Sequence, residues 1–245
     1  MTKKTPLILI LLLMVISLSA QDATQIMEKV DANMSSENRI VESSMTIHGR
    51  RNSRTITSKT YTVGTTQSFT EYLSPAREKG TKMLKLEDRL WTYYPANDRT
   101  IQISGHMLRQ SVMGSDMSYE DMMDDRKLTE VYTPKVIATE EMEGREVYVL
   151  ELTAKVDDAT YYSRKMWIDT QRYIPVREEL FAKSGQLLKR TILSDFKQQE
   201  GRWYPMTINY KDMLKQGKGT DMKIISIQFD QEIPAYLFTK AALKQ

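Results

Sequence analysis

The chain has 245 residues, of which 27% are charged and 40% are hydrophobic, and its formal net charge at pH 7 is +3. It contains no cysteine, which excludes disulfide frameworks, thiolate zinc sites, cysteine nucleophiles and a lipid anchor on an N-terminal cysteine. The small net charge argues against an electrostatic footprint for nucleic acid. Methionine is unusually frequent, with 16 residues.

Residues 1–20 have the pattern of a secretory signal peptide. Two lysines precede an almost wholly apolar run, Pro6–Leu18, and small residues follow up to Ala20. An uncleaved membrane anchor is the alternative, but the run is shorter than the ~20 residues that a spanning helix needs. We expect cleavage near Ala20, export to the periplasm, and a mature chain of residues 21–245 with a net charge of +1 once the two lysines leave.

The mature chain is expected to begin with an amphipathic helix over Asp22–Met34. Its apolar residues recur at helical spacing, and Asp22 is a plausible N-cap. The residues predicted on the buried face are Ala23, Ile26, Met27, Val30 and Met34.

The period of the apolar residues then changes to two, and turn residues bound roughly a dozen short strands. The expected strands are Ile40–His48, Arg54–Val63, Gln67–Leu73, Lys82–Leu86, Arg89–Tyr94, Arg99–Ile103, Leu128–Ile137, Val147–Thr153, Tyr161–Ile168, Ile174–Phe181, Leu187–Phe196, Trp203–Tyr210 and Met222–Phe229. This spacing favours an antiparallel meander, closed or half-closed as a barrel. With no repeat and no linker, residues 21–245 are predicted to form one domain.

Two segments interrupt the strands. Gly105–Arg126 contains five methionines, at positions 107, 113, 117, 122 and 123, and Ser118 with Asp121 resembles a capping box at the start of a short helix, Tyr119–Asp125. Because methionine adapts to irregular apolar partners, this segment suits a movable apolar lid, while a helix packed permanently on the barrel is the alternative. Ala235–Leu243 is expected to form a C-terminal helical turn.

Catalytic patterns are sparse. His48 and His106 are the only histidines and have no metal-ligand spacing, and there is no phosphate-binding glycine loop, nucleophile elbow or HExxH motif. The acidic residues between Asp116 and Asp125 are explained by capping and the helix dipole better than by calcium coordination. We therefore expect no metal, no cofactor and no enzymatic activity. A hydrolase that uses Asp116 and Glu120 is a remote alternative.

Several strands are partly apolar on both faces, where a half-solvated sheet would alternate cleanly. Examples are the strand over Tyr161–Ile168 and the aromatic runs Leu90–Pro95 and Trp203–Pro205. One face must meet the helices, and the other must meet a partner, a lid or a ligand. A filled barrel core with aromatic residues at its ends is the alternative.

The order of these elements, together with six sequence motifs, resembles the LolA-like family of outer-membrane lipoprotein-sorting proteins. The motifs are Gly80-Thr-Lys-Met-Leu-Lys, Leu90-Trp-Thr-Tyr-Tyr-Pro, Ser111-Val-Met-Gly-Ser-Asp followed by Tyr119-Glu-Asp, Met166-Trp-Ile-Asp, Tyr173-Ile-Pro-Val-Arg-Glu and Gly201-Arg-Trp-Tyr-Pro. The resemblance implies a mainly β, α+β fold. It would be a half-open antiparallel barrel of about 11–12 strands, with the N-terminal helix and a short helical lid over an apolar cavity.

The resemblance also implies a function and a set of site residues. The chain would be a soluble, monomeric periplasmic carrier of lipoprotein acyl chains or other lipids, with an inner-membrane transporter and an outer-membrane acceptor as partners and no role for nucleic acid. A lipid-sensing or adaptor module that partners a membrane transporter or regulator is the second hypothesis. The counterpart of the family's lid-latching arginine is Arg77. The expected cavity and lid residues are Met83, Leu84, Leu86, Trp91, Tyr93, Met107, Met113, Met122, Met123 and Trp167.

Overall fold

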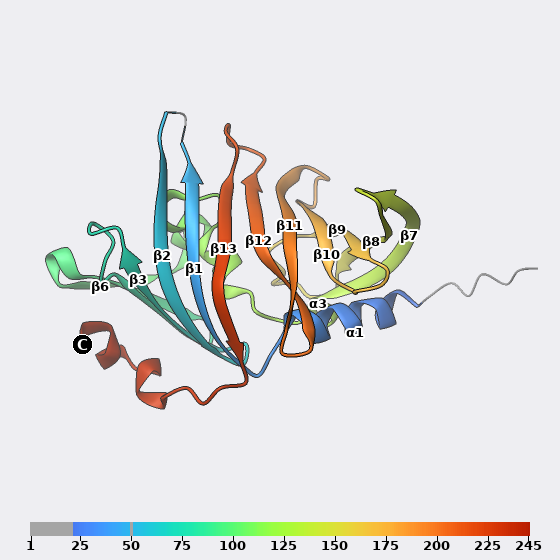
Figure 1. Cartoon of the computed structure of the whole chain (residues 1–245). Coiled ribbons are helices and arrows are strands. Elements are labelled where there is room, and N and C mark those ends of the chain that lie inside the picture. Colours follow the sequence, from blue (N-terminus) through green and yellow to red (C-terminus); the bar gives the residue numbers. More distant parts are fainter. Residues whose placement is uncertain (1–21, 50) are drawn as a thin grey trace, which may run out of the picture.

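The computed structural model describes residues 22–49 and 51–245, and one antiparallel sheet dominates it (Figure 1). The predicted signal peptide and its cleavage site lie outside the described residues. Within these two ranges, no helix combines the length and the hydrophobicity that crossing a bilayer would require.

The sheet has 13 strands, as many as the ranges expected from the sequence pattern and one or two more than the resemblance implied, and every neighbouring pair is antiparallel. The strands are β1 (Asn38–His48), β2 (Ser53–Val63), β3 (Gln67–Ser74), β4 (Lys82–Leu86), β5 (Arg89–Tyr94), β6 (Arg99–Ile103), β7 (Tyr132–Met142), β8 (Arg145–Ala154), β9 (Ser163–Asp169), β10 (Pro175–Phe181), β11 (Leu187–Gln199), β12 (Arg202–Asp212) and β13 (Thr220–Phe229). Their spatial order is β6-β5-β4-β3-β2-β1-β13-β12-β11-β10-β9-β8-β7. Because β6 and β7 are the two edges and do not pair, the sheet is open, which confirms the half-open architecture.

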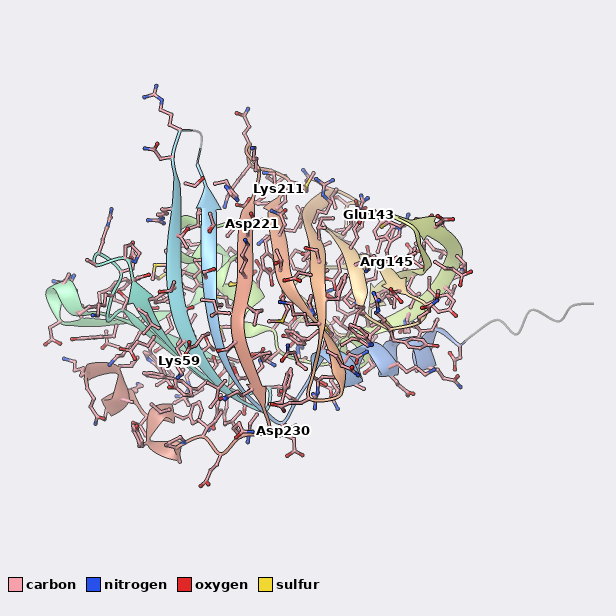
Figure 2. The ribbon with its side chains drawn as sticks, in the orientation of Figure 1. Lys59, Glu143, Arg145, Lys211, Asp221 and Asp230 are labelled. Atoms are coloured by element: carbon pink, nitrogen blue, oxygen red, sulfur yellow. The ribbon has the colours of Figure 1, made fainter. Side chains whose placement is uncertain are left out.

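The two faces of the sheet differ in what covers them. Strand register places Met45, Ile56, Tyr72, Met83 and Leu90 on one face, which we call the inner face. The outer face presents polar side chains such as Lys59 on β2 and Asp221 on β13, both labelled in Figure 2.

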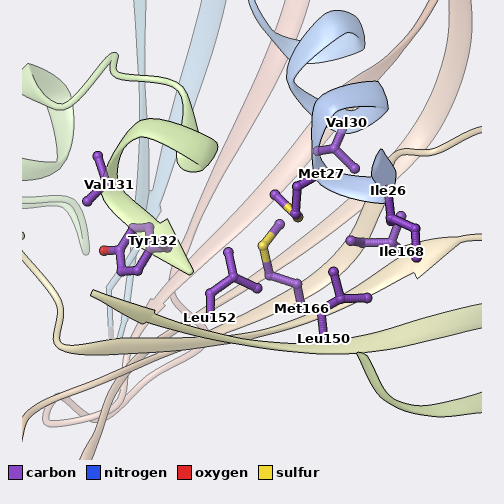
Figure 3. Close-up of a cluster of buried hydrophobic side chains, with 9 residues drawn as sticks. All are labelled: Ile26, Met27, Val30, Val131, Tyr132, Leu150, Leu152, Met166 and Ile168. Carbon is purple, nitrogen blue, oxygen red and sulfur yellow. The ribbon is translucent and has the colours of Figure 1, made fainter. Parts of the chain in front are cut away.

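Helix α1 (Ala23–Met34) covers the inner face at one end of the sheet, as the sequence predicted. The side chain of Asp22 accepts a hydrogen bond from the Thr24 amide, which confirms the N-cap. Figure 3 shows the buried face of α1 against strands β8 and β9. The residues of this cluster are Ile26, Met27, Val30, Val131, Tyr132, Leu150, Leu152, Met166 and Ile168.

The segment between β6 and β7, residues 104–131, joins opposite edges of the sheet, and its side chains pack on the inner face. We call this segment the insert. In Figure 1 it lies behind the strands. It consists of η2 (Gly105–Arg109), η3 (Val112–Gly114), α2 (Tyr119–Met123) and α3 (Leu128–Val131). The predicted capping box of Ser118 and Asp121 is confirmed, although α2 ends two residues before the predicted helix.

The prediction of a strand over Leu128–Ile137 is wrong in its first four residues. Residues Leu128–Val131 form the helical turn α3, and β7 begins at Tyr132. The reason is a distant residue: the carboxylate of Asp31, on α1, accepts hydrogen bonds from the amides of Leu128 and Thr129 at 3.2 Å each. A cap supplied from another element leaves no local signal in the sequence.

The C-terminal segment covers the outer face at the other end of the sheet, where Figure 1 shows it as short coils beside β3 and β6. It forms the 3-10 turns η4 (Ala235–Phe238) and η5 (Lys240–Lys244), in agreement with the predicted helical turn. Phe238 and Leu243 pack there against Phe69, Leu84 and Trp91. The outer face therefore has its own apolar cluster, separate from the clusters beneath α1 and the insert.

Candidate functional site

A cavity of about 330 Å³ lies on the inner face, beneath α1 and the second half of the insert. Its floor is formed by strands β9 to β12 and by Arg39 of β1. The lining residues are Val30, Asp31, Met34, Ser35, Arg39, Asp121, Asp124, Asp125, Arg126, Lys127, Leu128, Thr160, Tyr161, Arg164, Pro175, Glu178, Leu180, Lys189, Arg190, Thr191, Leu193, Tyr204, Ile208, Tyr210 and Lys211.

This lining is amphipathic. Val30 and Met34 of α1 contribute apolar surface, and so do Leu180, Leu193 and Ile208 of the sheet. Charged and phenolic side chains make up most of the rest. A pocket with both kinds of surface suits a ligand that has both an apolar and a polar part.

One polar anchor holds the insert to the sheet at Asp121 of α2. Its carboxylate pairs with the Lys189 ammonium of β11 and accepts a hydrogen bond from the Tyr161 hydroxyl at 2.5 Å. Burial pushes the pKa of Asp121 up, but Lys189 and the hydrogen bonds from Ser118 and Tyr161 outweigh burial, so its pKa is below the ordinary value. Asp121 is therefore ionised at neutral pH and ties α2 to the sheet.

A second anchor lies just after α2, at Asp125. One carboxylate oxygen is 2.6 Å from the Arg39 guanidinium of β1, and the other is 3.0 Å from the Lys85 ammonium of β4. The ammonium of Lys85 also donates to the backbone oxygens of Thr65, at 2.7 Å, and Met123, at 2.5 Å. Because the Lys85 side chain is only 3% exposed, these partners offset the cost of burying its ammonium.

Further polar contacts hold the first half of the insert. The carboxylate of Asp116 accepts hydrogen bonds from the Thr220 hydroxyl at 2.9 Å and the Asp212 amide at 3.0 Å. The ammonium of Lys215 donates to the Ser111 hydroxyl at 2.6 Å. The guanidinium of Arg54 donates to the backbone oxygen of residue 113. The insert is thus fastened by polar groups along its whole length.

Between these anchors the insert packs its methionines against the inner face. Met107, Met113, Met122 and Met123 pack on a cluster that includes Met45, Ile56, Tyr72, Met83, Leu90 and Ile103. Each of the four is only partly buried. These flexible side chains cover apolar strand surface without forming a deep core of their own.

The predicted cavity residues divide between the two faces and do not line one cavity. Five of the ten lie on the inner face or the insert, namely Met83, Met107, Met113, Met122 and Met123. Four others lie on the outer face with the C-terminal segment, namely Leu84, Leu86, Trp91 and Tyr93. Trp167 is also on the outer face, in a separate cluster with Val147 and Val149. None of the ten lines the 330 Å³ cavity. Strands that are apolar on both faces do not reveal which face is covered by which element.

Arg77, the predicted latch, lies in the turn after β3 with 86% of its side chain exposed. Its nearest charged partner among the described residues is Glu78, at 3.9 Å. The cations that pair with Asp121 and Asp125 of the insert are Arg39, Lys85 and Lys189, none of which the sequence reasoning identified. A signal was present for Lys85, which stands inside the apolar run from Met83 to Leu86, where a charge needs a buried partner.

Two charged residues of the cavity floor form a long ion pair. Arg164 of β9 and Glu178 of β10 face each other with 3.7 Å between guanidinium nitrogen and carboxylate oxygen, and each side chain is about 15% exposed. Within the described residues, Nε of Arg164 has no hydrogen-bond partner. Burial raises the pKa of Glu178, and Arg164 offsets this only in part.

The acidic residues of the insert do not gather at one place. Asp116, Asp121 and Asp125 each turn to a different partner on the sheet, and Asp124 pairs with Arg126 at 2.9 Å. Across residues 22–49 and 51–245, no group of three or more metal-ligating side chains comes together. These contacts instead suit a segment that is held against the sheet by ion pairs.

Comparison with known proteins agrees with this architecture. Residues 64–245 match a family model described as an uncharacterized protein. The chain belongs to this family. No curated protein matches the sequence. A solved domain from Vibrio parahaemolyticus, named for outer-membrane lipoprotein sorting, has a TM-score of 0.78 and 23% identity over 91% of this chain and 98% of its own.

Two further solved structures have the same fold. A LolA superfamily protein from Nitrosomonas europaea gives a TM-score of 0.75 with 24% identity over 90% of this chain and 98% of its own. A DUF1329 family protein from Desulfovibrio piger gives 0.80 with 23% identity over 90% of this chain and 97% of its own. The chain shares its fold with these three structures, one of them a LolA superfamily protein, in agreement with the resemblance seen in the sequence.

Proposed function

We propose that this protein is a periplasmic carrier that binds the acyl chains of lipoproteins or other lipids between the insert and the inner face of the sheet. It would deliver them toward the outer membrane without catalysing a reaction, taking them from an inner-membrane transporter and passing them to an acceptor. The observation that carries this proposal is the position of the insert. It crosses the whole inner face on methionine side chains and polar anchors, and an amphipathic cavity lies beneath it.

The energetics of the cargo favour a cover of this kind. An acyl chain in water costs about 0.8 kcal/mol per CH₂, so a carrier must shield nearly all of it. When the insert lifts, its methionines would lose their contacts with the sheet, and the sheet and methionines would contact the acyl chain instead. The net binding free energy would therefore be moderate. Moderate affinity is what a carrier needs, because the cargo must leave for an acceptor membrane.

The polar anchors set how readily the insert opens. A hydrogen bond to a charged group contributes about 1.5–3 kcal/mol. Losing one anchor should therefore raise the ratio of open to closed insert about tenfold or more. Lys189→Met removes the ammonium that holds Asp121 and keeps the length of the side chain. We expect this variant to take up a fluorescent fatty acid about tenfold faster than the wild type, measured by stopped-flow fluorescence.

The matched control is Lys59→Met, which breaks the exposed Lys59–Glu42 pair on the outer face, where the two charges are 3.1 Å apart. It should leave uptake unchanged. Native mass spectrometry of protein purified from a membrane-containing host should show co-purified lipid. A folded wild type that carries no lipid and takes up no acyl probe would contradict the carrier proposal.

A further inference from the structure

We propose that the cavity beneath α1 and the insert binds a zwitterionic head group in which an ammonium and a phosphate are linked, as in phosphoethanolamine lipids. This inference rests on the proposed function, since it names the polar part of the lipid that the protein would carry. It is carried by the Arg164–Glu178 pair on the cavity floor, whose charged groups are 3.7 Å apart, and by Nε of Arg164, which has no partner among the described residues.

Arg164 is held in place but keeps hydrogen-bonding capacity. Its guanidinium lies 4.9 Å from the ring centre of Tyr132 and 5.8 Å from that of Tyr161, which fixes its orientation. Its Nε atom is buried without a partner among the described residues, and the nearest carboxylate is 3.7 Å away, beyond hydrogen-bond distance. A guanidinium is a planar fork of N–H donors, the group that best recognises a phosphate.

Glu178 offers the complementary charge. Its carboxylate lines the cavity, and its one ion pair among the described residues is the long contact with Arg164. Burial without hydrogen bonds is costly for a carboxylate and raises its pKa. A ligand ammonium beside Glu178 would supply both the missing charge and the missing donors.

Two of the other cations that line the cavity are already paired with carboxylates. Arg39 is paired with Asp125, and Lys189 with Asp121. A bare anion at Arg164 would be repelled by Glu178, and a bare cation at Glu178 would be repelled by Arg164. A head group with both charges satisfies the two side chains together.

Size and surroundings agree with this assignment. A volume of about 330 Å³ is at the lower end of ligand pockets, which suits a head group better than several acyl chains. The phenols of Tyr204 and Tyr210 line the same space and can bond to phosphate oxygens. Leu180 and Leu193 adjoin the charged pair and would meet the start of the apolar chain.

The test uses water-soluble head groups that have no acyl chains. Isothermal titration calorimetry on the full mature chain should show glycerophosphoethanolamine binding about tenfold tighter than glycerophosphoglycerol, which has the phosphate but no ammonium. Glycerophosphocholine, whose ammonium has no N–H donors, should also bind more weakly. Equal affinities for the three compounds, or no binding of glycerophosphoethanolamine, would overturn the proposal.

A double variant locates the site. Arg164→Gln with Glu178→Gln removes both charges and leaves neither one buried alone, so the fold should be retained. We expect it to lose the tenfold preference. The matched control, Glu42→Gln with Lys59→Gln, removes a directly opposed pair from the outer face and should keep the preference. If the double variant does not fold, the preference of the wild type for glycerophosphoethanolamine alone decides whether the proposal stands.

The fatty-acid uptake assay separates this inference from the carrier proposal. Uptake of the probe without a preference among the three head groups would overturn the head-group site and leave the carrier function standing. A preference for glycerophosphoethanolamine without uptake of any acyl probe would instead support the site and contradict the carrier function.

Discussion

Asp121 combines a local and a distant role in one side chain. Its Oδ2 accepts from the Ser118 amide at 2.6 Å and from the Ser118 hydroxyl at 2.8 Å, which caps α2. The same carboxylate pairs with Lys189 and with the Tyr161 hydroxyl, which ties α2 to the cavity. The start of the helix and the closure of the insert therefore depend on one ionised group.

Acid should release this anchor. The pKa of Asp121 in the folded protein is below its ordinary value of about 3.9, because Lys189 and the hydrogen bonds outweigh burial. Its stabilising contribution is therefore complete above the unfolded pKa and is lost as the pH falls through the folded pKa. Hydrogen exchange of residues 105–126 should lose protection below about pH 4 in the wild type.

Asp121→Asn should lose protection already at pH 7 and show a smaller further loss in acid than the wild type. Asp98→Asn is the control, because Asp98 pairs with Lys244 on the surface and its pKa is also lowered, chiefly by that lysine. It should leave the insert unchanged. Equal protection of residues 105–126 in wild type and Asp121→Asn at pH 7 would show that the carboxylate is not an anchor.

At the scale of elements, α1 organises the insert as well as the core. Its apolar face closes the cluster over β8 and β9, while Asp31 on the same helix caps α3 through the Leu128 and Thr129 amides. The hydroxyl of Thr129 donates to the same carboxylate at 2.6 Å. The helix thereby decides where the insert ends and β7 begins.

Asp31→Ala should destabilise the protein by about 1–2 kcal/mol, the usual cost of losing a helix cap. The last turn of the insert would lose its three hydrogen bonds from this side chain, and thermal unfolding followed by circular dichroism should report a lower Tm. Glu28→Ala, at an exposed position of the same helix, should stay within about 0.5 kcal/mol. Equal Tm values for the two variants would contradict this capping role.

At the scale of the whole molecule, the open sheet protects each face with a different segment. The inner face is covered by α1 and the insert, and the outer face beside β3 to β5 is covered by the C-terminal turns. Because the two covers lie on opposite sides of one sheet, they can be altered separately.

Deleting residues 232–245 tests this separation. The deletion would uncover Phe69, Leu84 and Trp91, which the C-terminal turns bury, and an exposed apolar patch of this kind promotes association. Light scattering should show concentration-dependent oligomers. Uptake of the acyl probe should remain, since the insert is intact. A deletion variant that stays monomeric, or that stays folded and loses uptake, would contradict two independent covers.

Much of the fold could be predicted, because its signals are local. Alternation and turn residues located the strands, and the bounds of β4, β5 and β6 agree with the expected ones to the residue. Helical spacing identified the buried face of α1, and the Ser118 and Asp121 spacing identified the capping box of α2. Each of these features depends on residues within a few positions of one another.

The site could be predicted only in part. The insert and its methionines were found, but the polar cavity and its charged residues were not. Arg39, Arg164, Glu178 and Lys189 stand on strands whose alternation indicates two faces without saying which one is covered. Leu84 and Trp91 were expected in the cavity for the same reason, and they lie on the outer face beneath the C-terminal turns.

The sequence by itself determined the class of fold, the position of most strands, the first helix and the interrupting insert, since periodicity and capping act over short distances. Only the tertiary structure decided which face the insert crosses and which cations meet its acidic residues. Pairs such as Asp125 with Lys85 join residues that are far apart along the chain. Such pairs come together because β6 and β7 form opposite edges of one open sheet and the insert that joins them packs across its inner face.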